Sequence, residues 1–265
     1  MATHPAGRAN AGTLVLMTSA ILFGTLIVAQ RLTAEQSGEG ASKVAVARRL
    51  RGSDVRLTAV RSLIIRGSKV RSTGGAEQFI YKFLLPGHFQ ETADDRTFTL
   101  RPRGYWQRPD PGEAAKATAQ RNKAGTFLEI TLLFLLRTPD RQGSFSLFQP
   151  PDGRALVKVT SADGLARTLV FSNVDQSLVG LEQHARLDQD GVSGSAVRQL
   201  SILAHREIGG IRFPTEWSER FATIENRVSI FEVIVNPALN FKDFDEPNTV
   251  PDVPGEAKMS RIARR

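Results

Sequence analysis

Two apolar patterns alternate along the chain, one with the period of a helix and one with the period of a strand. The first helical pattern is broken at Gly52 and carries arginines on its outer face; its apolar positions are Val44, Val46, Ala47, Leu50, Val55, Leu57 and Val60. This spacing predicts one helix or two short ones at the start of the folded part.

After Arg61 the pattern changes to short runs bounded by Gly, Pro and Asp, which is typical of antiparallel strands joined by tight turns. Before the turn at Pro86-Gly87, one aromatic face is predicted from Phe79, Tyr81, Phe83 and Leu85. We expect residues 88–92 to return and residues 97–107 to continue the sheet, with Phe98 and Leu100 directed inward. Later strands are predicted at Ser144–Phe148, Ala155–Thr160, Ala166–Phe171, Ser177–His184, Val197–Glu207, Arg212–Arg220 and Val228–Val235.

The segment between these two sets of strands lacks alternation. Residues 113–124 are rich in Ala, Lys, Gln and Arg, and residues 127–136 are almost entirely apolar around Glu129 and Thr131. We predict one helix here, and a helix that is apolar on nearly every side must be enclosed by protein or by a ligand. The order helix, strands, helix, strands predicts a single α+β domain, a curved antiparallel β-sheet with helices on its concave side.

An uncharged segment, residues 9–30, precedes the predicted domain, and its apolar stretch from Leu14 to Ala29 follows a single Arg8. This layout is typical of a secretory signal peptide cut after Ala29. An uncut membrane anchor is the alternative, although the basic residues that follow disfavour it, and a buried core helix is a third interpretation. We assign residues 1–30 to a signal peptide or N-terminal anchor, 31–43 to a linker, 44–247 to the domain and 248–265 to a disordered basic tail. The protein is therefore expected in the periplasm or another extracytoplasmic compartment, free or anchored to the inner membrane.

The amino-acid composition excludes several kinds of functional site. The chain has no cysteine, so disulfides, thiolate metal sites and cysteine nucleophiles are excluded. Its formal net charge is +8, and the stretch from Arg31 to Arg71 holds ten Lys or Arg but only three acidic residues. No nucleic-acid partner is expected for an exported protein. The basic segment is interpreted either as a contact for anionic lipid headgroups or as a solvated helix face.

The sequence contains no recognisable set of catalytic residues. The histidines at positions 4, 88, 184 and 205 lack the spacing of a metal site. Residues 191–195 lack the spacing of a nucleophile elbow and are interpreted as a hairpin loop. Pairs of aspartates lie in turn-rich stretches, where Asp is favoured for its local hydrogen bonds. We expect no enzyme activity, no metal and no cofactor.

Three segments resemble the periplasmic lipoprotein carriers called LolA and their LolA-like relatives. The first is VRLTAVRSLIIRGS at Val55–Ser68, and the second is EQFIYKFLLPGHFQE at Glu77–Glu91. The third combines REIGGIRFPTEW at Arg206–Trp217 with IFEVIVNPALNFKDFDEP at Ile230–Pro247. These motifs are turns and strand ends, and they carry over no catalytic residue. The resemblance implies an unclosed, strongly curved half-barrel whose apolar concave side is covered by helices and can hold acyl chains.

From this resemblance we expect an exported, non-enzymatic and monomeric protein that binds lipid or handles lipoproteins. The expected cavity lining is Phe79, Tyr81, Phe83, Phe98, Leu100, Phe127, Ile130, Leu133 and Phe134. The expected contacts with headgroups or an anionic membrane surface are Arg48, Arg49, Arg51 and Arg56. A structural or scaffolding envelope protein with a filled core is the chief alternative, and a hydrolase is the third. The pattern alone does not distinguish a cavity from a packed core.

Overall fold

The computed structural model describes residues 38–110, 112–148, 150, 154–189 and 192–246 of the 265-residue chain. Residues 38–50 form a helix that precedes the short helix α2 (Asp54–Ala59). The first strands are β1 (Ser62–Arg71), β2 (Ala76–Leu84), β3 (His88–Ala93), β4 (Arg96–Arg101) and β5 (Gly104–Arg108). Helix α3 (Glu113–Leu135) separates them from the remaining elements: β6 (Ser144–Phe148), β7 (Ala155–Thr160), β8 (Ala166–Phe171), β9 (Leu178–Gln189), β10 (Val192–Ile208), β11 (Ile211–Phe221), β12 (Ile224–Val235) and the 3-10 helix η1 (Phe241–Phe244).

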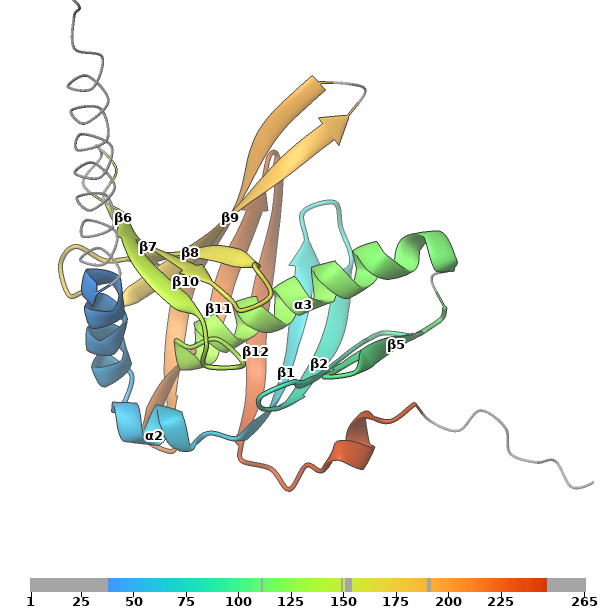
Figure 1. The fold of residues 1–265 in the computed structure, drawn as a ribbon, viewed down its shortest axis with the longest axis horizontal. Helices are drawn as coiled ribbons and strands as arrows, with labels where there is room; N and C mark the ends of the chain where they lie inside the picture. Colours follow the sequence, from blue (N-terminus) through green and yellow to red (C-terminus); the bar gives the residue numbers. More distant parts are fainter. Residues whose placement is uncertain (1–37, 111, 149, 151–153, 190–191, 247–265) are drawn as a thin grey trace, which may run out of the picture.

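These strands form one antiparallel sheet in the order β5-β4-β3-β2-β1-β12-β11-β10-β9-β8-β7-β6. Strands that follow each other in the chain are paired, except β5 and β6, and β1 pairs with β12 at the centre, where Leu63 lies opposite Val235. The sheet is unclosed and strongly curved (Figure 1). Strands β5 and β6 lie at opposite edges although they are consecutive in sequence. Helix α3, which joins them, therefore has to cross the concave face of the sheet (Figure 1).

The hydrophobic core lies between this concave face and the C-terminal half of α3. Leu63 and Ile65 of β1 and Phe79 and Phe83 of β2 are buried, and less buried residues lie between them. This alternation arises because successive side chains of a strand point to opposite faces of a sheet. In α3, residues 127–135 are buried without interruption, whereas exposed residues occur in the N-terminal half. The buried and exposed residues of α3 are thus separated along its length and do not form two opposite faces.

Most elements predicted from the pattern are confirmed. The helical period breaks at Gly52 between residues 38–50 and α2, and α3 covers the predicted mid-chain segment. Strands β6, β7 and β8 have the predicted bounds. The predicted fold class is confirmed as well, since a curved, unclosed antiparallel sheet carries a helix on its concave face.

Three segments differ from their predictions. Residues 38–43, assigned to a linker, are helical, and Gly40 allows this helix to approach β6: a Cβ there would lie 2.9 Å from the backbone nitrogen of Leu147. Residues 97–107, predicted as one stretch, form β4 and β5 around a turn. The hairpin of β9 and β10 extends into the predicted loop because Gln189 and Val192 still pair. The predictions for residues 1–30 and 248–265 lie outside the described residues.

Among the helices in the described parts of the chain, none is both long enough and apolar enough to span a membrane.

Candidate functional site

The residues predicted to line a cavity lie mostly at the interface of the sheet and α3. Seven of the nine are buried, and Tyr81 and Leu100 are partly buried against the same core. Phe98 lies apart from the continuous core, because it stacks on Tyr105 at a centroid distance of 5.4 Å and lies under Lys123. The structure therefore brings eight of the nine together.

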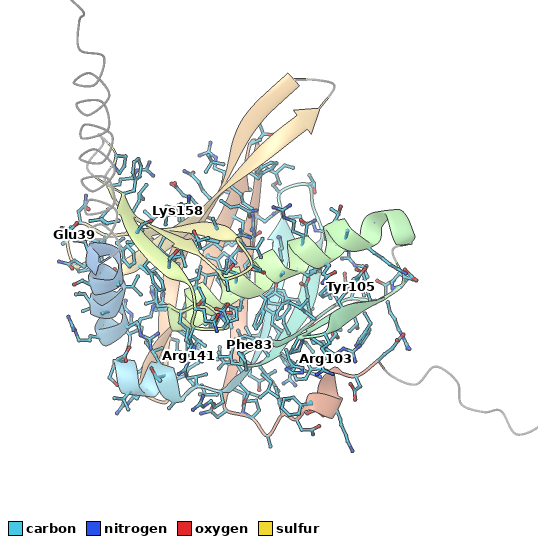
Figure 2. The ribbon with its side chains drawn as sticks, viewed as in Figure 1. Glu39, Phe83, Arg103, Tyr105, Arg141 and Lys158 are labelled. Carbon is cyan, nitrogen blue, oxygen red and sulfur yellow. The ribbon has the colours of Figure 1, made fainter. Side chains whose placement is uncertain are left out.

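Side chains fill the interface at these positions. The ring of Phe127 stacks on that of Phe89 at 5.2 Å and lies 6.1 Å from that of Phe83. Phe134 lies 5.7 Å from Phe213 and 6.4 Å from Trp217, which are both on β11. Figure 2 shows the side chains between α3 and the sheet, with Phe83 labelled. Contact at these distances corresponds to a packed interior.

Two of the four arginines predicted to contact headgroups are buried instead. Arg48 is 8% and Arg51 is 4% exposed, and both donate hydrogen bonds to carbonyl oxygens at the C-terminal end of α3. The Nη1 of Arg48 lies 2.8 Å from the carbonyl oxygen of Leu135, and the Nη1 of Arg51 donates to that of Leu133. The last carbonyls of a helix lack partners within the helix and carry partial negative charge, so cations stabilise them. These two arginines thus cap α3, which corrects their assignment to the surface.

The other two predicted headgroup contacts are exposed. Arg49 lies on the outer side of the helix at residues 38–50, and Arg56 donates from Nη1 to the carbonyl oxygen of Gly210 at 3.1 Å. Burial lowers the pKa of Arg51 to about 9, with a further contribution from the nearby charge of Arg212. Arg51 therefore keeps its proton, and its capping function, at neutral pH.

A cluster of charged side chains lies around Glu129, in the C-terminal half of α3. Glu129 accepts hydrogen bonds from Arg198 Nη1 at 2.8 Å and from Arg167 Nε at 3.4 Å. Arg198 also pairs with Glu219 at 3.1 Å, and Lys69 pairs with Glu219 at 2.6 Å. The charge of Glu129 raises the pKa of Arg198, whereas burial lowers the pKa of Arg167. We call these five residues the Glu129 cluster.

The Glu129 cluster was not predicted from the sequence. The available signal was Glu129 itself, a carboxylate inside the otherwise apolar run of residues 127–136. Its direct and indirect partners come from β1, β8, β10 and β11, which are distant from α3 in sequence. No fixed spacing can reveal such a cluster, because only the folded sheet brings the strands together.

A hollow of about 570 Å³ lies beside the cluster, between α3 and the concave face. Arg167, Gln183 and Arg198 lie at one level across β8, β9 and β10, since Thr168 pairs with Glu182 and Arg198 with Gln183. The polar side chains of the hollow are Lys69, Arg121, Asn122, Thr126, Arg167, Gln183 and Arg198. We call it the cationic hollow.

Two smaller hollows flank α3. One, of about 240 Å³, lies on the other side of its N-terminal half, where Lys123 pairs with Glu91 at 2.7 Å. The other, of about 270 Å³, lies between the helix at residues 38–50 and the end of α3, and it is lined by Val44, Leu136 and Phe145 among others. Polar surface therefore lies along the N-terminal half of α3, and apolar surface lies near its C-terminal end.

Among the described residues, the histidines belong to no group of possible metal ligands. Within the described residues, no group of three His, Asp or Glu side chains could hold a metal ion. Burial, followed by the charges of Arg51 and Arg212, lowers the pKa of His205 to about 4, so this imidazole is neutral at neutral pH. The structure describes the backbone of His184 but not its side chain.

Three solved structures are similar to the chain at low identity. A DUF1329 family protein from Desulfovibrio piger matches with a TM-score of 0.47 and 9% identity, covering 78% of this chain and 97% of the other. A domain from Vibrio parahaemolyticus, described as outer membrane lipoprotein-sorting, matches with a TM-score of 0.48 and 11% identity over 79% and 97% of the two chains. A LolA superfamily protein from Nitrosomonas europaea matches with a TM-score of 0.47 and 10% identity over 78% and 97%.

No protein-family model and no curated protein matches the sequence. Two of the structures given above carry names from the group that the sequence motifs resemble. Likeness at these TM-scores and identities transfers neither an activity nor a ligand. The conclusion that the sheet is antiparallel and unclosed rests on the strand order of this chain and not on these similar structures.

Proposed function

We propose that the protein is an exported, non-enzymatic lipid-binding or lipoprotein-handling protein that holds acyl chains between the concave face of the sheet and α3. One observation carries this proposal. The C-terminal half of α3, residues 127–135, is buried on every side and lies across the open concave face of a sheet that does not close. The helix and the concave face of the sheet bury apolar surface against each other. An acyl chain could take the place of one partner in these contacts.

The way α3 is attached makes such a replacement physically reasonable. The strands are joined by backbone hydrogen bonds, whereas Arg48, Arg51, Arg167 and Arg198 hold α3 from the side through their side chains. A shift of α3 would have to break these side-chain bonds and the apolar contacts of residues 127–135, but it would leave the backbone pairing of the strands intact. Each buried methylene contributes about 0.8 kcal/mol, so ten of them contribute about 8 kcal/mol, which is comparable to a few charged hydrogen bonds at about 1.5–3 kcal/mol each.

A structural or scaffolding envelope protein is the second candidate, and a specific observation favours it. The rings of Phe127 and Phe89, and those of Phe134 and Phe213, are already in contact, so the interior is filled without a ligand. In this case the Glu129 cluster would only fix α3 in place. The two candidates differ in whether α3 leaves its position to admit a chain.

The two tryptophans of the chain provide a direct test. Trp217 is buried beside Phe134 of α3, whereas Trp106 donates from Nε1 to the carbonyl oxygen of Phe244 in η1 at 2.9 Å. We would titrate the full chain carrying Trp106→Phe with a brominated fatty acid, a contact quencher, below the concentration at which it aggregates. Because an acyl chain under α3 would contact Trp217, we expect saturable quenching of its fluorescence.

The matched control is the full chain carrying Trp217→Phe, in which Trp106 is the reporter. Its fluorescence should change little over the same titration. No quenching in either variant, together with no acyl species in lipid extracts of the purified protein, would contradict the carrier proposal and leave the scaffold. Equal quenching of both would place the fatty acid at no defined site and would also contradict it.

A further inference from the structure

The cationic hollow has more positive charge than its neighbouring carboxylates neutralise. Lys69, Arg121, Arg167 and Arg198 line it, and the carboxylates in contact with them are Glu129 and Glu219. Four cations against two carboxylates leave an excess of two positive charges at one place. Two cations would suffice to neutralise the two glutamates, so charge neutralisation alone does not explain why four cations line the hollow.

Two donors of the hollow, Arg198 and Arg167, are fixed by their other bonds. Arg198 is held between Glu129 and Glu219, at 2.8 and 3.1 Å. Arg167 donates from Nε to Glu129 and from Nη1 to the carbonyl oxygen of Ala166, at 3.4 and 2.8 Å. A guanidinium has five N–H groups, so each arginine retains donors for a ligand. A site whose donors are held in place loses little side-chain entropy when it binds.

Arg121 completes the set from the polar half of α3. It is exposed, lines the hollow, and makes no ion pair with any residue that the structure describes. The amide side chains of Asn122 and Gln183 add neutral donors around the same space. The volume of about 570 Å³ lies within the range of about 300–1,000 Å³ that is usual for small-ligand sites.

We propose that the cationic hollow is a binding site for a phosphate ester, with Arg121, Arg167, Arg198 and Lys69 as its cationic ligands. A phosphate monoester carries a charge of about −1.5 to −2 at neutral pH, which matches the excess of two positive charges. Arginine favours phosphate because its planar fork can donate two parallel hydrogen bonds to it. Two sources share this chemistry, a lipid headgroup and a free soluble phosphate. The lipid source rests on the proposed function; the anion site itself does not.

Isothermal titration of the full chain with four small probes separates these cases. The probes are inorganic phosphate, glycerol 3-phosphate, dihexanoyl phosphatidic acid and dihexanoylglycerol, with the two lipids kept below their micelle concentrations. We expect the three phosphates to bind and dihexanoylglycerol to bind more weakly than the phosphatidic acid. Binding should also weaken as salt is raised, because these charges lie in a hollow that solvent reaches.

The decisive variant is Arg121→Ala, which removes a cation without breaking any ion pair of the Glu129 cluster. Loss of one charged hydrogen bond predicts weaker binding of glycerol 3-phosphate by about tenfold or more. The matched control is Arg103→Ala, the same change at an exposed arginine in the turn between β4 and β5 (Figure 2). It should leave the affinity unchanged.

The outcomes either support or overturn the proposal. Tighter binding of dihexanoyl phosphatidic acid than of glycerol 3-phosphate identifies a lipid headgroup, and equal binding identifies a free phosphate ester. No phosphate binding by the parent protein, or an equal loss in Arg121→Ala and Arg103→Ala, overturns the site. Phosphate binding with no quenching of Trp217 by the brominated fatty acid would overturn the acyl carrier and leave the anion site standing.

Discussion

At the scale of single residues, Gly125 is the position at which the side chain of Arg167, on β8, packs against α3. A Cβ on this glycine would lie 2.6 Å from Nη2 of Arg167. Glycine inside a helix costs about 1 kcal/mol relative to alanine, so a helix interior ordinarily disfavours it. Its absence of a side chain allows the guanidinium of Arg167 to lie against the helix and reach Glu129.

Substitution Gly125→Ala should therefore separate stability from binding. Helix propensity favours alanine by about 1 kcal/mol, and the atom it displaces is Nη2 of Arg167, which is not the atom that bonds to Glu129 or Ala166. We therefore expect the free energy of unfolding to stay within about 1 kcal/mol of the parent value. Binding of glycerol 3-phosphate should fall, because the guanidinium of Arg167 has to move. Urea unfolding and isothermal titration of the same protein provide the two measurements. Unchanged binding would show that the position of Arg167 does not matter to the anion.

At the scale of the element, α3 is held by charges that belong to other parts of the chain. Arg48 bonds to the carbonyl of Leu135, to the hydroxyl of Thr58 at 3.0 Å and to the carboxylate of Asp54. Arg137, just after α3, donates from Nη2 to the carbonyl oxygen of Val60 at 2.6 Å. The N-terminal helices and the end of α3 are thereby bonded to each other.

Substitution Arg48→Met tests the importance of this cap. Methionine keeps most of the aliphatic volume but leaves the carbonyl of Leu135 without its donor, so we expect the free energy of unfolding to fall by about 2–3 kcal/mol. Arg49→Met, at the neighbouring exposed position, should change it by less than about 0.5 kcal/mol. Urea denaturation of the two variants measures the difference. Equal losses would mean that Arg48 contributes no more than a surface charge.

The same elements define what the sequence could and could not predict. The strands β6 to β8 follow from local alternation, and the buried half of α3 follows from a continuous apolar run; both signals lie within a short window of the chain. Arg48 and Arg51 were misplaced because an arginine on a helix near other arginines is usually solvated, and their acceptors lie more than eighty residues away in sequence, at separations of 87 and 82. Glu129 was noticed, but its partners become neighbours only when four strands pair.

At the scale of the whole molecule, the interior is divided into an apolar part and a charged part. The apolar part packs against residues 127–135 of α3, a segment that also carries Glu129, and the cationic hollow lies toward the N-terminal half of the helix. If the proposed acyl site and the proposed phosphate site are both occupied by one lipid, its chain would lie under residues 127–135 and its headgroup in the cationic hollow.

The apolar part is also where the stability of the molecule is concentrated. Leu133 is fully buried, so Leu133→Asn removes apolar contacts and places an amide among side chains that cannot bond it; we expect a loss of about 3 kcal/mol or more. Leu203→Asn, at a position that is 52% exposed on β10, should cost less than about 0.5 kcal/mol. Thermal unfolding of both variants checks this pair. A small loss for Leu133→Asn would reveal space beside Leu133 that water or a lipid chain can occupy.

The pairing of β1 with β12 in the centre of the sheet has a consequence for how the molecule assembles. These two strands come from opposite ends of the described domain, so one edge of β1 has no partner until the last strand arrives. Bringing distant segments together costs loop-closure entropy before contacts compensate for it, and unpaired strand edges tend to associate with other chains. The hairpins on either side form from local contacts, whereas the seam between them forms late. Folding of this chain is therefore expected to be slow and sensitive to concentration, and a truncation before β12 would leave the middle of the sheet open rather than its rim.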